Sequence, residues 1–266
     1  MLDKLIKQFM SREGVKEITH IFFRENIEIC FVGGCIRDAL NGFQSFDIDF
    51  AINCKPEDTI KRLQKNNIKF EEYGKKYGSI VAKINNKKYE ITSLREDFNQ
   101  KGRDTDVKFT SDWYKDALRR DFTMNAMYLS PTGQLYDYFE GQQDLANQQI
   151  RFIGNIEQRI QEDYLRIFRF YRFLGCFKDL NILSYYEKIL CKHIPQIKKY
   201  IKNDTMRNEI LKMFKNPYTI NSLRDFNNLS MKNDLIKQIN EWWIEDNYFL
   251  GIQKCMSKVN KYFVNK

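Results

Sequence analysis

The sequence predicts an α+β fold in which a mixed sheet is followed by helices alone. Over about the first 140 residues, β-branched segments alternate with amphipathic segments, and turn residues separate them. From Asp144 onward the apolar residues recur with the 3.6-residue period of a helix, and proline is rare. We therefore expect a head at residues 1–141, a helical neck at 142–205 and a short helical body or tail at 206–266.

The head begins with a helical segment, residues 1–28, followed by a buried strand. "IEICFVGG" is apolar and β-branched until it meets two glycines, which predicts a strand that enters a tight turn. "CIRDALNG" predicts a short helix that ends at Gly42, and "FDIDFAI" alternates as a second strand does. "KPEDTIKRLQKNN" predicts an amphipathic helix with Pro56 near its first turn.

Further strands and one loop complete the head. "GSIVAKINNKKYEITSLR" predicts two strands joined at Asn85–Asn86, a dipeptide typical of hairpin turns. Residues 96–112 are polar, include Gly102 and predict a loop. Order resumes in "DALRRDFTMNAMYL", and "GQLYDYFEG" predicts another strand with turns beside it.

The charge balance favours a polyanionic partner. The 266 residues are 42% apolar, enough for a sizeable core, and carry a net charge of +9. Residues 176–266 hold 16 Lys or Arg against 9 Asp or Glu, so +7 of the excess lies in the C-terminal third. Nucleic acid or a membrane surface would be a suitable partner for such a chain. The alternative explanation of the positive charge is an AT-rich coding sequence, which favours lysine codons.

The cysteines and histidines predict no zinc site. The six cysteines show no CxxC spacing, and the pair Cys191 and His193 lacks a second half. No apolar run reaches transmembrane length, and no signal peptide is recognised. We therefore expect free thiols in a reducing compartment without membrane attachment, the cytoplasm or alternatively an organellar matrix.

Two aspartates one residue apart suggest a metal site. In a strand, Asp47 and Asp49 would point to the same face with their side chains roughly 7 Å apart along the strand. Two carboxylates on one face repel each other unless a cation lies between them, and hard oxygen ligands suit Mg²⁺. Glu90, at the end of another strand, could add a third acidic group. The alternative is that all three belong to solvent-facing strand surfaces.

Two glycines and an arginine precede these aspartates. Gly33 and Gly34 lie between a strand and a helix, where backbone N–H groups can approach a phosphate without a Cβ in the way. Arg37, one turn into that helix, can add a charged fork, and Asp38 would orient it. Alone, this pattern could be a structural turn with a surface ion pair. Beside the two aspartates it predicts a triphosphate held next to its metal.

The motifs together resemble a known family. "GGCIRD" followed by "DID" resembles the head domain of class II tRNA nucleotidyltransferases and bacterial poly(A) polymerases, which belong to the polymerase-β-like nucleotidyltransferase superfamily. "YEITSLREDFNQKGRD", "RRDFTMNAM" and "EDYLRIFRFYRF" are similar to the family's strand with flexible loop, ribose motif and base-reading neck helix, in the family's order. The similarity covers about residues 28 to 175. Further on, "IKNDTMRNEILKMFKNP" resembles the helical RNA-binding region.

The resemblance implies a Mg²⁺-dependent enzyme that adds C and A to the 3′ end of tRNA from CTP and ATP. Asp47, Asp49 and Glu90 would be its catalytic carboxylates, with the two aspartates as metal ligands. The ribose motif implies nucleotide contacts by Arg119, Arg120 and Asn125, without saying which arginine faces the nucleotide. Read alone, that motif could be an exposed basic helix start capped by Asp121. The triphosphate contacts fall on the residues named above: Gly33, Gly34 and Arg37.

The neck helix carries a pattern suited to base recognition. Asp163, Arg166, Arg169 and Arg172 follow each other at intervals of three and lie among aromatic residues, where arginines need partners. Cytosine and adenine both present an exocyclic amine beside a bare ring nitrogen, so one Asp and one Arg could accept both and reject G and U. The family assigns this role to Asp163 and Arg166, and Arg169 and Arg172 would aid phosphate or helix positioning. A surface ladder of ion pairs is the alternative.

Other activities remain open from the sequence. A poly(A) polymerase shares nearly every motif, and an enzyme that adds only A or only CC is a further alternative. The resemblance gives the loop "REDFNQKGRDTD" a part in the switch from C to A addition. A non-enzymatic RNA-binding protein is the remaining option, which the paired carboxylates count against. Because 91 residues follow Gly175, fewer than in typical members, a partner chain or a homo-oligomer could complete the tRNA grip.

Overall fold

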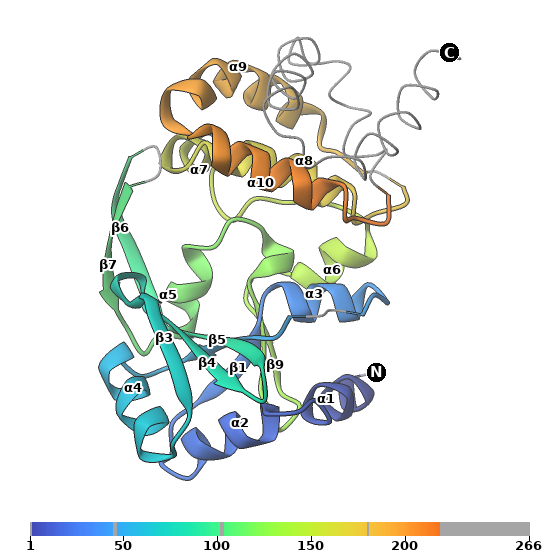
Figure 1. Ribbon diagram of the computed structural model, residues 1–266. Coiled ribbons are helices and arrows are strands. Elements are labelled where there is room, and N and C mark those ends of the chain that lie inside the picture. The colour runs from blue at the N-terminus through green and yellow to red at the C-terminus, as the bar shows by residue number, and fades with distance from the viewer. Residues whose placement is uncertain (1, 45–46, 102–103, 180, 219–266) are drawn as a thin grey trace, which may run out of the picture. The chain divides into compact units, whose positions relative to one another are not determined.

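The computed structural model describes residues 2–44, 47–101, 104–179 and 181–218 (Figure 1). The chain divides into two compact units, a first that ends at Asp163 and a second that begins at Tyr164. Most of the predicted body at 206–266 lies outside the described residues. The predicted domain boundaries at 141 and 205 stay predictions.

The first unit is built on a seven-stranded mixed sheet in the order β3-β4-β5-β2-β1-β8-β9. Strands β2 and β5 pair in parallel, and the other neighbours are antiparallel. The strands are β1 (Ile29–Val32), β2 (Asp49–Ile52), β3 (Lys69–Gly74), β4 (Ser79–Ile84), β5 (Lys87–Ser93), β8 (Met127–Leu129) and β9 (Leu135–Asp137). The predicted mixed sheet is therefore confirmed.

Side chains from alternate positions of the central strands pack on opposite faces of the sheet. On one face, the Phe31 ring lies 4.9 Å from the Phe9 ring and 5.2 Å from the Phe50 ring. On the other face, Cys30 and Val32 join a buried cluster with Tyr128. The helices of this unit are α1 (Leu2–Met10), α2 (Val15–Phe23), α3 (Gly34–Leu40), α4 (Pro56–Lys65), α5 (Trp113–Leu118), α6 (Gly141–Ala146) and α7 (Ile156–Glu162). Two short 3-10 turns complete the unit: η1 (Lys75–Tyr77) lies between β3 and β4, and η2 (Thr123–Asn125) lies between α5 and β8.

The prediction of a loop at residues 96–112 is wrong for most of that segment. Strands β6 (Arg95–Lys101) and β7 (Asp104–Phe109) form a separate antiparallel hairpin, with Phe98 opposite Asp106. A two-stranded hairpin with polar residues on both sides lacks the apolar alternation that identifies a strand resting on a core. The polar edge strand β3 was missed for the same reason.

Three other expectations need correction. Gly14 adopts the left-handed conformation (φ 79°) and divides the helix predicted at 1–28 into α1 and α2. The strand predicted in "FDIDFAI" begins only at Asp49, so Asp47 precedes it. Residues 147–155 are not helical, and Phe152 forms a β-bridge with Phe122.

The second unit is helical throughout its described residues, apart from short connections, as predicted. Its helices are α8 (Leu165–Leu174), α9 (Ser184–Tyr200) and α10 (Asn203–Met213). Arg172 of α8 forms an ion pair with Glu209 of α10 at 3.2 Å, and Asn216 Nδ2 donates to the Arg172 carbonyl at 2.5 Å. Within the described chain, no helix combines the length and apolar character needed to cross a membrane.

Gly141 provides a direct test of packing behind η2. A Cβ placed at Gly141 would lie 2.5 Å from the Thr123 carbonyl oxygen and 3.2 Å from Met124 Cα, and both are backbone atoms. We expect Gly141→Ala to lower the free energy of unfolding by about 2–3 kcal/mol, because α6 or η2 must move. Gln142→Ala, at the next and exposed position of α6, is the control and should change it by less than about 0.5 kcal/mol in urea unfolding. Equal effects of the two substitutions would contradict the packing argument.

Candidate functional site

The turn between β1 and α3 brings backbone close to basic side chains. Gly33 has φ 73° and ψ −123°, a conformation that side-chain-bearing residues rarely adopt, and its N–H donates to the Met127 carbonyl at 3.4 Å. A Cβ there would lie 3.7 Å from Arg120 Nη1. At Gly34, a Cβ would lie 3.6 Å from Arg37 Nη2. The two predicted glycines therefore border two predicted arginines.

Arg37 is held in one orientation by its neighbours. Its Nε and Nη2 donate to Asp38 Oδ1 at 2.8 and 2.6 Å, as the sequence suggested, and its Nη1 donates to Asn125 Oδ1 at 2.8 Å. The side chain is 12% exposed. A charged fork with little freedom loses little entropy when it binds an anion, which suits a phosphate contact.

Asn125 lies on η2 and is buried with its amide engaged. Its Nδ2 donates to Asp121 Oδ1 at 3.2 Å, while its Oδ1 accepts from Arg37. Asp121 Oδ1 also accepts the backbone N–H of Phe122 at 2.8 Å. An amide carries two donors and an acceptor with two lone pairs, so these bonds leave it capacity for a ligand hydroxyl. The predicted alternative, in which Asp121 caps a helix start, does not describe these contacts.

One buried carboxylate binds both arginines of the ribose motif. Asp116 Oδ1 accepts from Arg119 at 2.9 and 2.7 Å, and Asp116 Oδ2 accepts from Arg120 at 3.3 and 3.1 Å and from the Tyr128 hydroxyl at 2.6 Å. Burial acts to raise the pKa of Asp116, but the two guanidinium groups and the Tyr128 hydrogen bond hold it well below its usual range. Asp116 therefore stays ionised and fixes the directions of both arginines.

The two arginines face different neighbours. Arg120 Nη1 donates to the Asn125 carbonyl at 3.4 Å and lies beside Gly33. Arg119 instead approaches Asp97 of the β6–β7 hairpin, with 3.9 Å between Nη1 and Oδ2. Arg120 is thus the member of the pair that borders the glycine turn.

Carboxylates gather at the start of β2. Asp49 pairs in register with Glu90 on the parallel strand β5. Burial, then the charges of Glu90 and Asp47, raise the pKa of Asp49 to about 7, although Arg120 and Arg37 oppose the shift. The electrostatic effect of each group on Asp49 shows that acidic and basic predicted residues share one region.

The acidic residues differ in their surroundings. Asp47 is exposed and precedes strand β2. The two aspartates therefore do not lie at positions i and i+2 of one strand, as the sequence predicted. Glu90 is exposed, and its Oε1 accepts from the Ser79 hydroxyl at 2.5 Å. Among the described residues, no three His, Cys, Asp or Glu side chains converge as a ready-made metal site. A cation here would need further oxygen ligands from a bound molecule or water.

The predicted base-reading helix is interrupted. Helix α7 ends at Glu162, Asp163 is extended (φ −150°, ψ 104°), and α8 begins at Leu165. The helical i, i+3 relation expected for Asp163 and Arg166 is therefore wrong. The boundary between the two compact units falls directly after Asp163, so Asp163 belongs to the first unit and Arg166 to the second.

The arginines that follow do share one helix. Arg166 on α8 is buried, and Arg169 is half-buried. Arg172 forms an ion pair with Glu209, and its Cζ lies 4.3 Å from the centre of the Phe173 ring. The contact of Arg172 with α10 suits the expected helix-positioning role. The expectation that Arg169 contacts phosphate stays a prediction.

Sequence reasoning missed three residues that support this site. They are Asp116, Tyr128 and Arg159. Arg159 is 8% exposed, and its Nη2 donates to the carbonyls of Arg119 and Arg120 at 2.6 Å each. The spacing of Asp116 three and four residues before the arginines was a usable signal, since such pairs meet on one helical turn. Nothing local points to Tyr128 or Arg159, because their contacts span the fold.

Comparisons with known proteins agree with this geometry. Residues 29–151 match the family described as the poly A polymerase head domain. The chain is 46% identical over 173 residues to the human mitochondrial CCA tRNA nucleotidyltransferase 1, which covers 65% of this chain and 40% of that protein. The chain thus spans about 40% of the length of this curated relative.

Solved structures show the same fold. The CCA-adding enzyme of Bacillus stearothermophilus in complex with CTP superposes with a TM-score of 0.69 at 29% identity, over 78% of this chain and 49% of that one. A tRNA nucleotidyltransferase complexed with a primer tRNA and an incoming ATP analog gives a TM-score of 0.65 at 25% identity, over 79% of this chain and 60% of that one. The polymerase-β-like head expected from the sequence is therefore confirmed as the fold.

The raised pKa of Asp49 predicts that its ionised carboxylate destabilises the folded protein, so stability depends on pH. The pKa of Asp49 is about 7 in the folded protein, against an ordinary value of 3.8. Between these two pH values the folded protein binds more protons at this carboxyl group than the unfolded chain does. The folded state therefore loses stability as pH rises from about 4 to 7. We expect Asp49→Asn, in chelator, to raise Tm by about 3–6 °C at pH 8 and by little at pH 4.5.

Asp58 on α4, with a side chain 44% exposed, offers a matched control, since its carboxylate pairs only with Lys61, at 3.8 Å, among the contacts described. Asp58→Asn should change Tm equally at both pH values in the same thermal unfolding series. If Asp49→Asn and Asp58→Asn show the same pH profile, the electrostatic repulsion at Asp49 is not as described.

Proposed function

We propose that the chain is a template-independent RNA nucleotidyltransferase, because residues 29–151 match the family described as the poly A polymerase head domain. The proposed reaction joins CMP and AMP units from CTP and ATP to the 3′ end of tRNA and releases pyrophosphate. One observation carries the proposal: the basic groups beside the glycine turn and the carboxylates of β2 and β5 lie in one region, where each shifts the pKa of Asp49. A nucleoside triphosphate with its metal needs both kinds of group.

The basic side of the site would hold the triphosphate. The geometry favours Arg37 and Arg120, which border Gly34 and Gly33, as the phosphate contacts. Preset guanidinium groups stabilise the negative charge that grows on the phosphate oxygens when the RNA 3′-hydroxyl attacks the α-phosphorus. Asn125, fixed between Arg37 and Asp121, would accept or donate a hydrogen bond at the ribose.

The acidic side would hold magnesium. The donors fit this ion, since Asp47 and Asp49 offer hard oxygen atoms and the substrate phosphates would supply further ligands. The mutual repulsion that raises the pKa of Asp49 would be relieved by a divalent cation. Bound there, Mg²⁺ would neutralise charge on the reacting phosphates. Glu90, in register with Asp49, would strengthen the negative potential that attracts the ion.

Base choice is assigned to Asp163 and Arg166, as the family resemblance suggests. An ionised Asp accepts from the exocyclic amine of C or A, and Arg donates to the bare ring nitrogen. G and U present the opposite pattern and would leave both groups unpaired in a closed site. The proposal requires no nucleic-acid template.

CCA addition is favoured over poly(A) synthesis by the relatives. The human relative and both solved structures are named for CCA addition or tRNA nucleotidyl transfer. Since the chain spans only part of their lengths, addition of A alone or CC alone remains an alternative of the same site. The cytoplasm, or an organellar matrix as the mitochondrial relative suggests, stays the predicted location.

The reaction is tested with tRNA lacking its 3′ end, Mg²⁺ and each NTP supplied separately. We expect incorporation from CTP and ATP at least about 100-fold faster than from GTP and UTP, the discrimination typical of sites that pair polar groups. Product length on sequencing gels separates the alternatives, since a long A tract would favour poly(A) polymerase. Incorporation of all four nucleotides at similar rates would refute base selection, and no incorporation at all would refute the enzyme.

The arginine pair gives a second test. We expect Arg120→Lys to raise the KM for ATP and CTP about 10-fold or more, because the fork beside Gly33 is lost. Arg119→Lys is the matched variant, held by the same carboxylate but directed to Asp97, and should leave KM within about 3-fold. Thermal unfolding of both variants separates binding from folding defects. A larger KM effect at Arg119 would reverse the assignment.

A further inference from the structure

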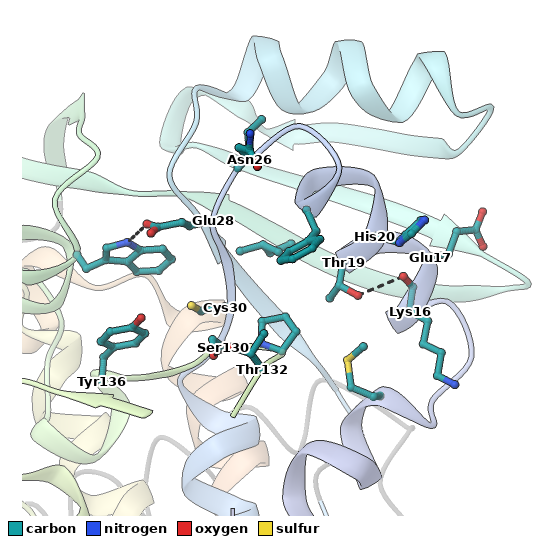
Figure 2. Close-up of a pocket in the computed structure, with 16 residues that line it drawn as sticks. Lys16, Glu17, Thr19, His20, Asn26, Glu28, Cys30, Ser130, Thr132 and Tyr136 are labelled. Carbon is teal, nitrogen blue, oxygen red and sulfur yellow. Dashed lines mark hydrogen bonds between the residues drawn. The ribbon is translucent and has the colours of Figure 1, made fainter. Parts of the chain in front are cut away.

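A large cavity opens in the first unit, apart from the proposed nucleotide site. It has a volume of about 840 Å³ and is bounded by α1, α2, the start of β1, Trp113 and the β8–β9 turn. None of its lining residues is among those predicted to bind nucleotide or metal. Figure 2 shows Glu28 and Tyr136 toward one end of the cavity, and Lys16, Glu17 and His20 toward the other.

The cavity has the size and lining of a small-molecule site. Pockets that enclose organic ligands commonly measure about 300–1,000 Å³ and are lined by apolar and aromatic side chains with a few polar groups. Here Phe23, Trp113 and Tyr136 come from three separate elements. Phe23 is 68% exposed, so its ring offers apolar surface that a molecule in the cavity would cover.

One carboxylate is fixed at the aromatic end. Glu28 Oε2 accepts from Trp113 Nε1 at 2.9 Å and from Asn53 Nδ2 at 3.1 Å (Figure 2 draws the Trp113 bond). A carboxylate has about four lone-pair sites, so these two bonds orient the group and leave acceptor capacity. Burial and, after it, the Glu28 charge raise the pKa of the neighbouring Cys30 thiol to about 12. The negative potential of Glu28 therefore extends to the cavity wall.

We propose that this cavity binds a small organic cation with an aromatic or aliphatic body. The apolar body would cover Phe23 and the inner wall, and the ammonium or guanidinium group would meet Glu28 beside the Trp113 and Tyr136 rings. Aromatic faces attract cations, and an oriented carboxylate adds a charge-assisted hydrogen bond. An anion of the same shape would meet the repulsion of Glu28, and a neutral analogue would gain only the apolar contact.

The test compares three probes of one shape: 4-phenylbutylammonium, 4-phenylbutanol and 4-phenylbutanoate. Trp113 is the reporter, because it lines the cavity, and Trp113→Phe identifies its contribution to the fluorescence change. We expect saturable binding of the cation, about 10-fold weaker binding of the alcohol and weaker binding still of the carboxylate. Titration calorimetry on the full chain gives the affinities independently of fluorescence.

Glu28→Gln removes the charge but keeps an oxygen that can accept from Trp113. This variant should bind the cation no better than the alcohol, while affinity for the alcohol stays unchanged. Glu57→Gln, an exposed carboxylate on α4 outside the cavity, is the matched control and should keep the preference for the cation. No saturable binding of the cation up to its solubility limit overturns the proposal. Equal affinity for cation and alcohol in the unmodified protein, or an unchanged preference in Glu28→Gln, overturns it as well.

Discussion

The buried carboxylate of Asp116 is the interaction on which the basic half of the site depends. It is 1% exposed and accepts from two guanidinium groups and one phenol. A buried charge is tolerated only when such partners satisfy it, and the partners are in turn held by it. Arg120 reaches the glycine turn and Arg119 reaches the hairpin because both extend from this one anchor.

The acidic half of the site obeys the opposite constraint. Asp49 is half-buried beside two other carboxylates, so the folded protein tolerates electrostatic repulsion there. Groups arranged for ligands rather than for stability commonly show such shifted pKa values. A magnesium ion with a triphosphate would remove the repulsion and meet Arg37 and Arg120 at once, which explains why two unlike clusters lie together.

Local motifs predicted the central features because those features are local. The turn at Gly33 needs a positive φ, the Arg37–Asp38 pair is adjacent in sequence, and the apolar run of β1 indicates its burial. The prediction failed where the reason lies elsewhere in the fold. The β6–β7 hairpin has no apolar face to reveal it, and Arg159 acts through backbone carbonyls some 40 residues earlier in the chain. The break at Asp163 also escaped notice, since no glycine or proline marks it.

The central claim is that the carboxylates bind nucleotide through a shared metal, and binding measurements without turnover test it most directly. Calorimetric titration of a non-reactive CTP analogue, with and without Mg²⁺, compares the unmodified protein with Asp49→Asn at pH 8. The account predicts that Mg²⁺ strengthens binding at least about 10-fold in the unmodified protein and has little effect in the variant. An equal gain from Mg²⁺ in both proteins would contradict the account.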